Sequence, residues 1–362
     1  MDKIRVLLVD DAAAVRRLVA DALNRDPDLH VAGTAANGQI ALDRLDELRP
    51  DVVVLDLEMP VMDGLQTLVA LRKVHPRLPV IMFSRHTRRG VEATVHALTL
   101  GADDYVPKPG DGLDVSACID DVLIPRIKLL VRRRGAAPAT DAVPAAAAAS
   151  ERSSTGRAHV EIVAIGASTG GPSALATLFA AFPPEWPVPL VVAQHMPRDF
   201  TAWLADTLTR KSVLGVREGA AGEPLSAAQA WIAPGGYHML VRRGGRAVEV
   251  AVNQDPPVNS CRPSVDVLFR SVAEVYGAGV LAIVLTGIGR DGLRGCECVR
   301  AAGGQVLVQD EATSVVWGMP GAVAKAGIAD RVLPLAQIGP EIVRRVQRHR
   351  ELASGTLEQP CP

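Results

Sequence analysis

The chain has 362 residues, too many for one average hydrophobic core, and 48% of them are hydrophobic, enough to fill two cores. The formal net charge is −1, so the composition gives no reason to expect a nucleic acid or an anionic membrane as partner. There is no run of about 18 apolar residues, and we expect no segment inserted in a membrane. The five cysteines are irregularly spaced, unlike a disulfide framework, and the N-terminus enters a strand at once instead of forming a signal peptide. We therefore expect a cytoplasmic protein.

The first third of the chain, residues 1–131, alternates short apolar runs with stretches of helical spacing. The run 4–9 (IRVLLV) is typical of a buried strand, and over 12–24 the apolar residues recur at helical intervals. This alternation predicts a domain with a parallel sheet covered by helices on both faces. The predicted strands are 4–9, 31–35, 52–55, 80–83 and 104–106, and the predicted helices are 12–24, 39–48, 64–74, 91–100 and 115–131.

The alternation then stops. Residues 132–157 are rich in Ala, Pro, Ser and Thr, which predicts a flexible linker. A second, larger α/β domain is predicted over 158–350, followed by a C-terminal tail, 351–362. Residues 234–237 (PGGY) predict a hairpin turn between the strands 230–233 and 238–241, and 246–252 is expected to pair with this hairpin. We therefore expect a doubly wound sheet with an antiparallel hairpin. The predicted strands of this domain are 160–165, 188–194, 230–233, 238–241, 246–252, 279–285 and 305–308, with a helix over 292–302.

Charged and polar side chains follow four strands of the first domain, at the edge where parallel sheets bind ligands. They are Asp10 and Asp11, Asp56, Ser84 and Lys108. Three carboxylates at one edge repel one another and favour a hard divalent cation such as Mg²⁺. With the cation bound, Asp56 can attack a phosphoryl group, Lys108 can neutralise its charge and Ser84 can bond the product phosphate. The alternative, that these aspartates only cap helices, accounts for Asp11 but not for matched residues at four strand ends.

These residues also carry a family resemblance. Residues 1–125 resemble a two-component receiver domain, a flavodoxin-like fold with a five-stranded parallel sheet. The resemblance implies that Asp56 accepts a phosphoryl group. It also implies that Asp11 and Asp56 hold Mg²⁺ together with the backbone carbonyl of Glu58, with Asp10 nearby. The matching stretches are Val9-Asp10-Asp11, Leu55-Asp56-Leu57-Glu58-Met59-Pro60, Met62-Asp63-Gly64, Gly101-Ala102-Asp103 and Lys108-Pro109.

The same resemblance assigns three residues to the receiver switch. Ser84 stands where the family usually has Thr or Ser, and Tyr105 stands where it has an aromatic side chain that moves with activation. Lys108 is the third member. The resemblance implies a histidine kinase as the phosphodonor.

The second domain opens with Gly166-Ala167-Ser168-Thr169-Gly170, which fits the G-x-S-x-G pattern between a strand and a helix. This geometry presents a serine beside a helix N-terminus, whose free N–H groups stabilise an oxyanion. A glycine-rich turn of this kind also binds nucleotide phosphates, and the motif alone leaves both interpretations open. The sequence is not GxGxxG, and the next strand ends in Gln194-His195 without an acidic residue.

His195 and Asp291 are the candidate partners of Ser168. His195 stands at a strand end, as Ser168 does, and Asp291 lies in the loop after the apolar run 279–285. A serine nucleophile needs a base and a group that orients the base. Asp291 is alternatively the N-cap of helix 292–302, and the two roles are compatible. The order Ser, His, Asp differs from the order in α/β-hydrolases, which disfavours an ordinary esterase of that fold.

With these residues assembled, 160–335 resemble the catalytic domain of the chemotaxis protein-glutamate methylesterases. By position, the resemblance makes Ser168 the nucleophile, His195 the general base and Asp291 its orienter. The matching stretches are Ile165-Gly166-Ala167-Ser168-Thr169-Gly170-Gly171-Pro172, Gln194-His195-Met196-Pro197, Ala233-Pro234-Gly235-Gly236-Tyr237-His238-Met239, Arg262-Pro263-Ser264-Val265-Asp266 and Leu285-Thr286-Gly287-Ile288-Gly289-Arg290-Asp291-Gly292.

The resemblance also places Thr169 and Ile288 beside the oxyanion region. Ile288 stands where the family commonly has Met, a change that removes no backbone N–H. Cys261 stands where the family frequently has His, and its effect has no explanation from the sequence. His238 is conspicuous, and we expect it to be structural or to face the substrate.

The two resemblances together imply a phosphorylation-controlled serine esterase. Its substrates would be glutamyl γ-methyl esters on the cytoplasmic domains of chemoreceptors, with release of methanol and with deamidation of receptor glutamines as a second activity. Mg²⁺ is expected in the first domain and no cofactor in the second. The alternatives are a signalling module without chemistry and a nucleotide-binding output domain.

Overall fold

The computed structural model describes residues 3–85, 87–108, 115–135, 159–245 and 247–353. The chain divides into two compact units between Thr140 and Asp141. Pro109, most of the predicted linker (136–157) and the end of the predicted tail (354–362) lie outside the described residues. No helix within the described ranges is both long enough and apolar enough to cross a bilayer.

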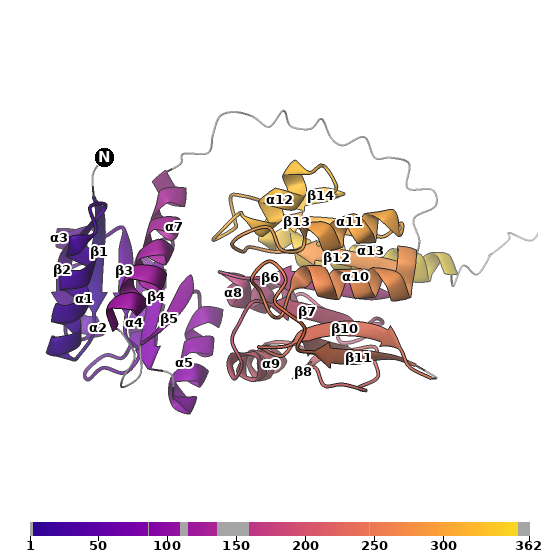
Figure 1. Ribbon diagram of the computed structural model, residues 1–362, viewed down its shortest axis with the longest axis horizontal. Coiled ribbons are helices and arrows are strands. Elements are labelled where there is room, and N and C mark those ends of the chain that lie inside the picture. The colour runs from indigo at the N-terminus through magenta and orange to yellow at the C-terminus, as the bar shows by residue number, and fades with distance from the viewer. Residues whose placement is uncertain (1–2, 86, 109–114, 136–158, 246, 354–362) are drawn as a thin grey trace, which may run out of the picture. The chain divides into compact units, whose positions relative to one another are not determined.

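The first unit contains a five-stranded sheet in the order β2-β1-β3-β4-β5, with every pair parallel (Figure 1). This confirms the predicted flavodoxin-like fold. All four residues of the central strand, β3, are buried, as expected where helices cover both faces. The strands are β1 (Ile4–Val9), β2 (Leu29–Ala35), β3 (Val52–Leu55), β4 (Val80–Arg85) and β5 (Asp104–Lys108).

The helices of this unit follow the predicted alternation with two departures. The predicted helix 39–48 is two short helices that meet at Arg44, whose φ of −105° and ψ of 0° end the first and open the second. The predicted helix 115–131 contains a π-helical turn and continues to Gly135. The helices are α1 (Ala13–Arg25), α2 (Gly38–Asp43), α3 (Leu45–Leu48), α4 (Gly64–Val74), α5 (Arg88–Thr99), α6 (Val115–Cys118), the π-helix η1 (Ile119–Leu123) and α7 (Ile124–Gly135).

The second unit contains a seven-stranded parallel sheet in the order β14-β13-β12-β6-β7-β9-β8 and a separate two-stranded antiparallel sheet, β10-β11. The central strands β6, β7 and β12 are buried throughout, in keeping with their continuous apolar sequences. The strands are β6 (Ile162–Ala167), β7 (Leu190–Gln194), β8 (Gly215–Glu218), β9 (Gln229–Ile232), β10 (His238–Arg243), β11 (Val248–Asn253), β12 (Val280–Val284), β13 (Gln305–Gln309) and β14 (Arg331–Leu333).

The hairpin turn predicted at 234–237 is wrong. The strand before it, β9, pairs in parallel with β7 and β8 in the large sheet, whereas the strand after it, β10, pairs with β11. The Pro-Gly-Gly-Tyr sequence signals a change of direction but not a pairing partner. Here the turn packs closely on the loop after β7. A Cβ on Gly235 would lie only 2.3 Å from the backbone nitrogen of Arg198, so only glycine fits there. The pairing predicted between 238–241 and 246–252 is confirmed as the β10-β11 hairpin.

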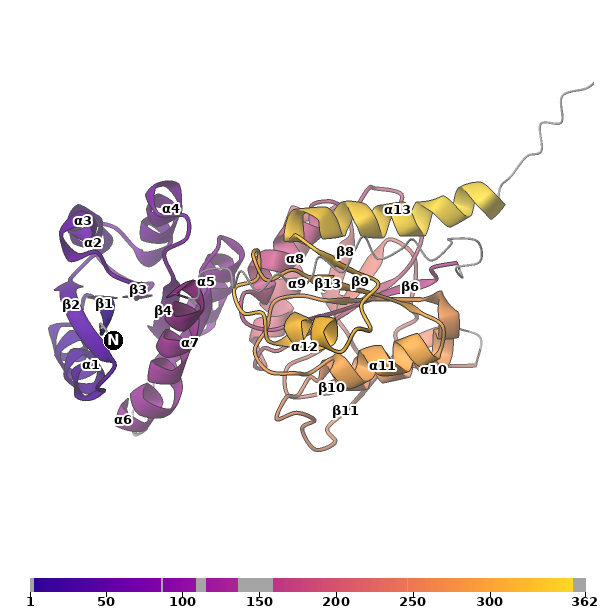
Figure 2. The ribbon, with the colours of Figure 1, turned by 90° about the horizontal axis from the view of Figure 1, so that it is seen from above.

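Helices cover both faces of the large sheet (Figure 2). On one face α13 and α9 both contact α8, and on the other α10 contacts α11, which contacts α12. The β10-β11 hairpin packs against α10. The helices of this unit are α8 (Gly171–Phe179), α9 (Phe200–Lys211), α10 (Val265–Tyr276), the 3-10 helix η2 (Gly277–Gly279), α11 (Leu293–Ala301), α12 (Met319–Lys325) and α13 (Leu335–Ala353).

Candidate functional site

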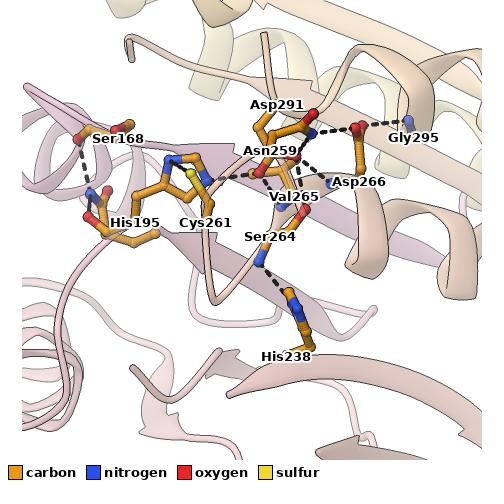
Figure 3. A network of polar contacts seen from close by, with 11 residues as sticks. Ser168, His195, His238, Asn259, Cys261, Ser264, Val265, Asp266, Asp291 and Gly295 are labelled. Carbon is orange, nitrogen blue, oxygen red and sulfur yellow. Dashed lines mark hydrogen bonds and ion pairs between the residues drawn. The ribbon is translucent and has the colours of Figure 1, made fainter. Parts of the chain in front are cut away.

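Three neighbouring strands of the large sheet end where the strand order reverses. β6 lies between β7 and β12, because the chain builds one side of the sheet after β6 and the other side from β12 onward. Ser168 follows β6, His195 follows β7, and Asp291 lies in the loop between β12 and α11. Figure 3 shows Ser168, His195 and Asp291 at these loops. Open parallel sheets bind their ligands beside such a reversal of strand order.

The turn that carries Ser168 is held by its neighbours. The Ser168 N–H donates to the carbonyl of Thr286 at 3.0 Å, and the Ser168 carbonyl accepts the N–H of Gly171 at 2.8 Å. Gly170 has a φ of +77°, and a Cβ there would lie 2.6 Å from the Cβ of Val315, so both conformation and space require glycine. Because α8 begins at Gly171, Ser168 lies beside a helix N-terminus that favours developing negative charge.

His195 and Asp291 form an ion pair, with His195 Nε2 2.8 Å from Asp291 Oδ2. Burial opposes the charge on His195, but the hydrogen bond to Asp291 and the neighbouring Cys261 outweigh it and raise the pKa of the imidazole to about 9. Burial also opposes the charge on Asp291, yet the hydrogen bond from His195 and its positive charge lower the pKa of that carboxyl to about 2. Asp291 is therefore a carboxylate at neutral pH. When the His195 imidazole is neutral, the hydrogen bond to Asp291 keeps the proton on Nε2, which leaves the lone pair on Nδ1.

Asp291 is anchored at the start of α10. Its carboxylate accepts the backbone N–H groups of Val265 at 2.6 Å and Asp266 at 3.2 Å, and the hydroxyl of Ser264 at 2.8 Å. The alternative role predicted for Asp291, N-cap of helix 292–302, is wrong. The N-cap of α11 is Gly292, with no side-chain cap, and the Asp291 carboxylate caps α10 instead. This position adds the favourable end of a helix dipole to the hydrogen bonds that keep Asp291 ionised.

Asn259 joins two buried carboxylates and was missed by sequence reasoning. Its amide nitrogen donates to Asp291 Oδ1 at 2.7 Å and to Asp266 Oδ2 at 2.8 Å. Burial raises the pKa of Asp266, although the backbone N–H of Gly295 also donates to its carboxylate. Asn259 and Ser260 have φ of +53° and +61°, so the loop adopts a left-handed turn to bring the amide between the carboxylates. The asparagine itself, a residue type that adopts left-handed conformations more readily than most, was the one local signal in the sequence.

Cys261, noted from the sequence only as a departure, lies against the candidate base. Its Sγ is 3.5 Å from His195 Nδ1 (Figure 3). In the described part of the chain, no hydrogen bond joins the Ser168 hydroxyl to the His195 ring. In unliganded active sites such contacts are often long and shorten when substrate binds. The structure thus brings His195 and Asp291 into direct contact, and it places Ser168 at the neighbouring strand end.

His238 has a structural role. It is 1% exposed, and its Nδ1 accepts the backbone N–H of Ser264 at 3.2 Å. Nε2 lies 3.2 Å from the carbonyl oxygen of Pro256, to which it donates. His238 therefore holds both ends of the loop that carries Asn259 and Cys261.

The two residues expected near the oxyanion lie in the loops that flank Ser168. Thr169 is buried in the turn before α8, and its carbonyl accepts the hydroxyl of Thr286 at 2.9 Å. Ile288 is 39% exposed. Its neighbour Gly287 approaches the serine closely, since a Cβ on Gly287 would lie 2.7 Å from Ser168 Cβ. The Ile288 backbone is therefore close to Ser168, whereas its side chain reaches solvent.

The acidic cluster of the first unit lies at the carboxyl ends of β1 and β3. Lys108 Nζ is 2.7 Å from Asp10 Oδ2 and 2.6 Å from Asp56 Oδ2. Burial raises the pKa of Asp56, although Lys108 acts in the opposite direction. Oxygens of Asp10, Asp11 and Asp56 lie within 4.8 Å of one another, a spacing that one cation can bridge. The side chain of Glu58 is exposed next to this cluster.

The candidate switch residues are arranged on β4 and β5. The hydroxyls of Ser84 and Thr94 are 2.8 Å apart, and Thr94 donates to the carbonyl of Gly90 at 2.7 Å, so Ser84 donates to Thr94. Ser84 is thus bonded to α5 and not to Asp56. Tyr105 is partly buried, and burial raises the pKa of its phenol well above the usual range.

Comparisons with known proteins identify the family. Residues 163–342 match the model described as CheB methylesterase, and residues 6–120 match that of the response regulator receiver domain. A protein of Trichodesmium erythraeum (strain IMS101), named protein-glutamate methylesterase/protein-glutamine glutaminase, is 47% identical over 351 residues, which are 96% of this chain and 100% of that protein. The chain belongs to the CheB methylesterase family.

Other members of the CheB methylesterase family agree with this assignment. A protein of the same name from Nocardioides sp. (strain ATCC BAA-499 / JS614) is 48% identical, with 97% of each chain covered. The crystal structure of the Thermotoga maritima CheB methylesterase catalytic domain is 38% identical, with a TM-score of 0.50, and covers 52% of this chain and 99% of that one. Both resemblances drawn from the sequence motifs are confirmed.

Proposed function

We propose that this CheB methylesterase family member hydrolyses glutamyl γ-methyl esters on the cytoplasmic domains of chemoreceptors, for adaptation in chemotaxis-type signalling. The observation that carries the proposal is the anchored Asp291 carboxylate, which holds His195 at the strand end beside Ser168. The names of the relatives, which cover nearly the whole chain, support a methyl ester of a protein glutamate as the substrate. The receptor as that protein is implied by the family resemblance.

The chemistry is acyl transfer to serine. Ser168 Oγ attacks the ester carbonyl while His195 Nδ1 takes its proton, and the methanol leaves with that proton. Water, activated by the same nitrogen, then hydrolyses the acyl-enzyme to the glutamate and regenerates Ser168. Backbone N–H groups near Thr169 and Ile288 are proposed to stabilise the oxyanion. A glutamine side chain would give the same acyl-enzyme with ammonia as the leaving group. The second unit would then also act as a glutaminase, and neither reaction requires a cofactor.

The first unit is proposed to be a Mg²⁺-dependent phosphoryl acceptor. The residues fit the cation, because three carboxylates converge and the buried Asp10 Oδ2 contacts Lys108 without a well-directed hydrogen bond. Asp11, Asp56 and the backbone carbonyl of Glu58 would hold Mg²⁺, with Asp10 nearby, and the cation would neutralise the charge of the transferred phosphoryl group. Asp56 would accept that group from a histidine kinase, and Lys108 would contact it.

Phosphorylation of Asp56 is proposed to control the esterase by relieving inhibition. An unphosphorylated receiver that covers the crevice would exclude a substrate as large as a receptor helix. A difference of a few kcal/mol between the two states would change the open fraction about a hundredfold. A fragment beginning near Arg157 should therefore be faster than the unphosphorylated full chain. The crystal structure of the separate catalytic domain of the Thermotoga maritima relative supports the use of such a fragment. A folded fragment slower than the full chain would instead make the receiver an activator.

The decisive experiment is methanol release from methylated receptor membranes. Ser168→Ala should lower the rate on the order of 10⁴-fold or more, because the members of a triad act as a unit. Ser173→Ala, on α8 just beyond the turn, is the matched control and should retain the wild-type rate. Near-wild-type methanol release by Ser168→Ala would refute the proposed mechanism.

The two alternatives drawn from the sequence have less support. A phosphate cradle at the start of α8 would need free N–H donors, yet the N–H of Gly171 already donates to the carbonyl of Ser168 at 2.8 Å. A signalling module without chemistry gives no reason for the buried His195–Asp291 pair. Nucleotide titration and the methanol assay, respectively, would reveal either alternative.

A further inference from the structure

A thiol and an imidazole face each other beside the candidate nucleophile. Cys261 Sγ lies 3.5 Å from His195 Nδ1, the nitrogen that carries the lone pair when the ring is neutral. Both residues are partly exposed. Their ligand atoms and an oxygen of Asp291 lie within 4.8 Å of one another. The proposed mechanism uses the imidazole but assigns no task to the thiol.

The separation of the two atoms suits a metal ion. Zinc binds histidine nitrogen at about 2.0–2.1 Å and cysteine sulfur at about 2.3 Å in tetrahedral geometry, which places the two ligand atoms about 3.6 Å apart. The distance of 3.5 Å between Nδ1 and Sγ therefore needs almost no rearrangement. Two protein ligands leave two positions for water or for a substrate group.

The surroundings of His195 prepare it as a ligand. Metal-bound histidines commonly donate their other ring N–H to a carboxylate, which fixes the tautomer and the ring orientation. Here Nε2 faces Asp291 Oδ2 at 2.8 Å, so Nδ1 is left to bind the metal. Asp291 is itself held by the N–H of Val265 and the amide of Asn259. The imidazole is therefore oriented toward the thiol before any metal arrives.

We propose that His195 Nδ1 and Cys261 Sγ form an inhibitory site for Zn²⁺ or another thiophilic divalent cation, with water completing the coordination. On binding, the sulfur–hydrogen bond of Cys261 breaks, sulfur–metal and nitrogen–metal bonds form, and the thiol proton together with any proton on His195 Nδ1 passes to solvent. The metal occupies the lone pair that His195 needs to deprotonate Ser168. The site differs in kind from the carboxylates of the first unit, which suit a hard cation such as Mg²⁺.

The first test is inhibition of methanol release by Zn²⁺ in the full-length protein, with Mg²⁺ saturating. This readout rests on the proposed function. Zn²⁺ should inhibit the wild type reversibly, and a zinc chelator should restore the rate. Cys261→Ser should raise the inhibition constant by at least about tenfold, with each rate normalised to the variant's own metal-free value. Cys298→Ser, a partly buried thiol on α11, is the matched control and should be inhibited like the wild type.

The second test is metal binding without turnover. Co²⁺ as a probe should give a thiolate-to-metal charge-transfer band in the wild type and in Cys298→Ser. That band should be absent in Cys261→Ser and Cys261→Ala, and His195→Ala should bind Co²⁺ at least about tenfold more weakly. These spectra test the site even if the esterase proposal fails. Equal inhibition of wild type and Cys261→Ser by Zn²⁺, or an unchanged band in the Cys261 variants, would overturn the site.

Discussion

Asp291 of the second unit and Asp56 of the first are both buried carboxylates beyond the carboxyl end of a parallel strand, but their surroundings differ. Asp291 accepts hydrogen bonds from two backbone N–H groups, a hydroxyl, an amide and His195. Asp56 contacts Lys108 and the N–H of Leu57, with Asp10 alongside. Burial opposes ionisation of both, yet the pKa of Asp291 is lowered to about 2 whereas that of Asp56 is raised.

The difference in hydrogen-bond donors shows how the surroundings of a buried carboxylate determine its chemical role. Fixed donors compensate for the loss of water and keep a carboxylate charged and immobile, which suits it to orient a histidine. Too few donors leave a carboxylate in need of further positive charge, which suits it to receive a cation and a phosphoryl group. The number of donors, and not burial, separates the two sites.

The strongest test of the comparison is Asp291→Asn. The amide keeps the shape but turns an NH₂ group toward donors that need an acceptor, and it no longer stabilises the imidazolium of His195. We expect the rate of methanol release to fall by about 10⁴-fold, with Asp255→Asn, in an exposed turn, as the control. A loss below about tenfold would mean that Asp291 does not orient the base.

The complementary test is Asp56→Asn. This change removes the phosphoryl acceptor but leaves the second unit intact. Basal methanol release should persist, whereas labelling and stimulation by a small phosphodonor with Mg²⁺ should disappear. The exposed Asp21→Asn should behave like the wild type in both assays. Unchanged labelling of Asp56→Asn would place the acceptor elsewhere.

A third test removes a donor from the well-supplied cluster. Asn259→Ala leaves both Asp266 and Asp291 short of a hydrogen bond, so the free energy of unfolding of the second unit should fall by about 1.5–3 kcal/mol. Asn253→Ala, whose amide bonds the exposed Asp255, should change it by less than about 0.5 kcal/mol. Urea unfolding measures both. Equal effects of the two changes would show that Asn259 is not needed to offset burial.

The smallest expected effect extends the comparison to Glu341 of α13. Burial opposes its charge, but Arg344 and Arg345 lower the pKa of its carboxyl from 4.5 to about 2. The stabilisation is present above the unfolded pKa and is lost as pH falls toward 2. At neutral pH Glu341→Gln should therefore unfold at a lower temperature than the wild type, because its free energy of unfolding should be about 1 kcal/mol lower. The difference should vanish at acid pH, and a pH-independent difference would assign it to packing.

The fold could be predicted from the sequence wherever the signal is local. The apolar runs of β1 and β3 and the helix after Asp63 have the predicted bounds, because burial and capping depend on neighbouring residues. The partners of β9 could not be predicted, because the Pro-Gly-Gly-Tyr turn fixes a bend and not a pairing.

The candidate site divides in the same way. Ser168, His195 and Asp291 stand at strand ends, where position alone indicates chemistry. The environment of Asp291 could not be predicted, because Asn259, Ser264 and Asp266 reach it only through the packing of α10 against α11. Local sequence instead suggested that Asp291 caps the helix that follows it.

The distance along the chain between the interacting residues has a consequence for biosynthesis. His195 and Asp291 are 96 residues apart, and the central strands β6, β7 and β12 must all have paired before they meet. Contacts between residues so far apart in the chain form late in folding, because the conformational entropy of the intervening chain must be lost before the contact stabilises it. Under the proposed mechanism, a nascent chain that ends before Asp291 lacks the group that orients His195 and should release no methanol. Methanol release would accordingly report the last step of folding of this unit. Spectroscopic measures of helix content would report folding before that step is complete.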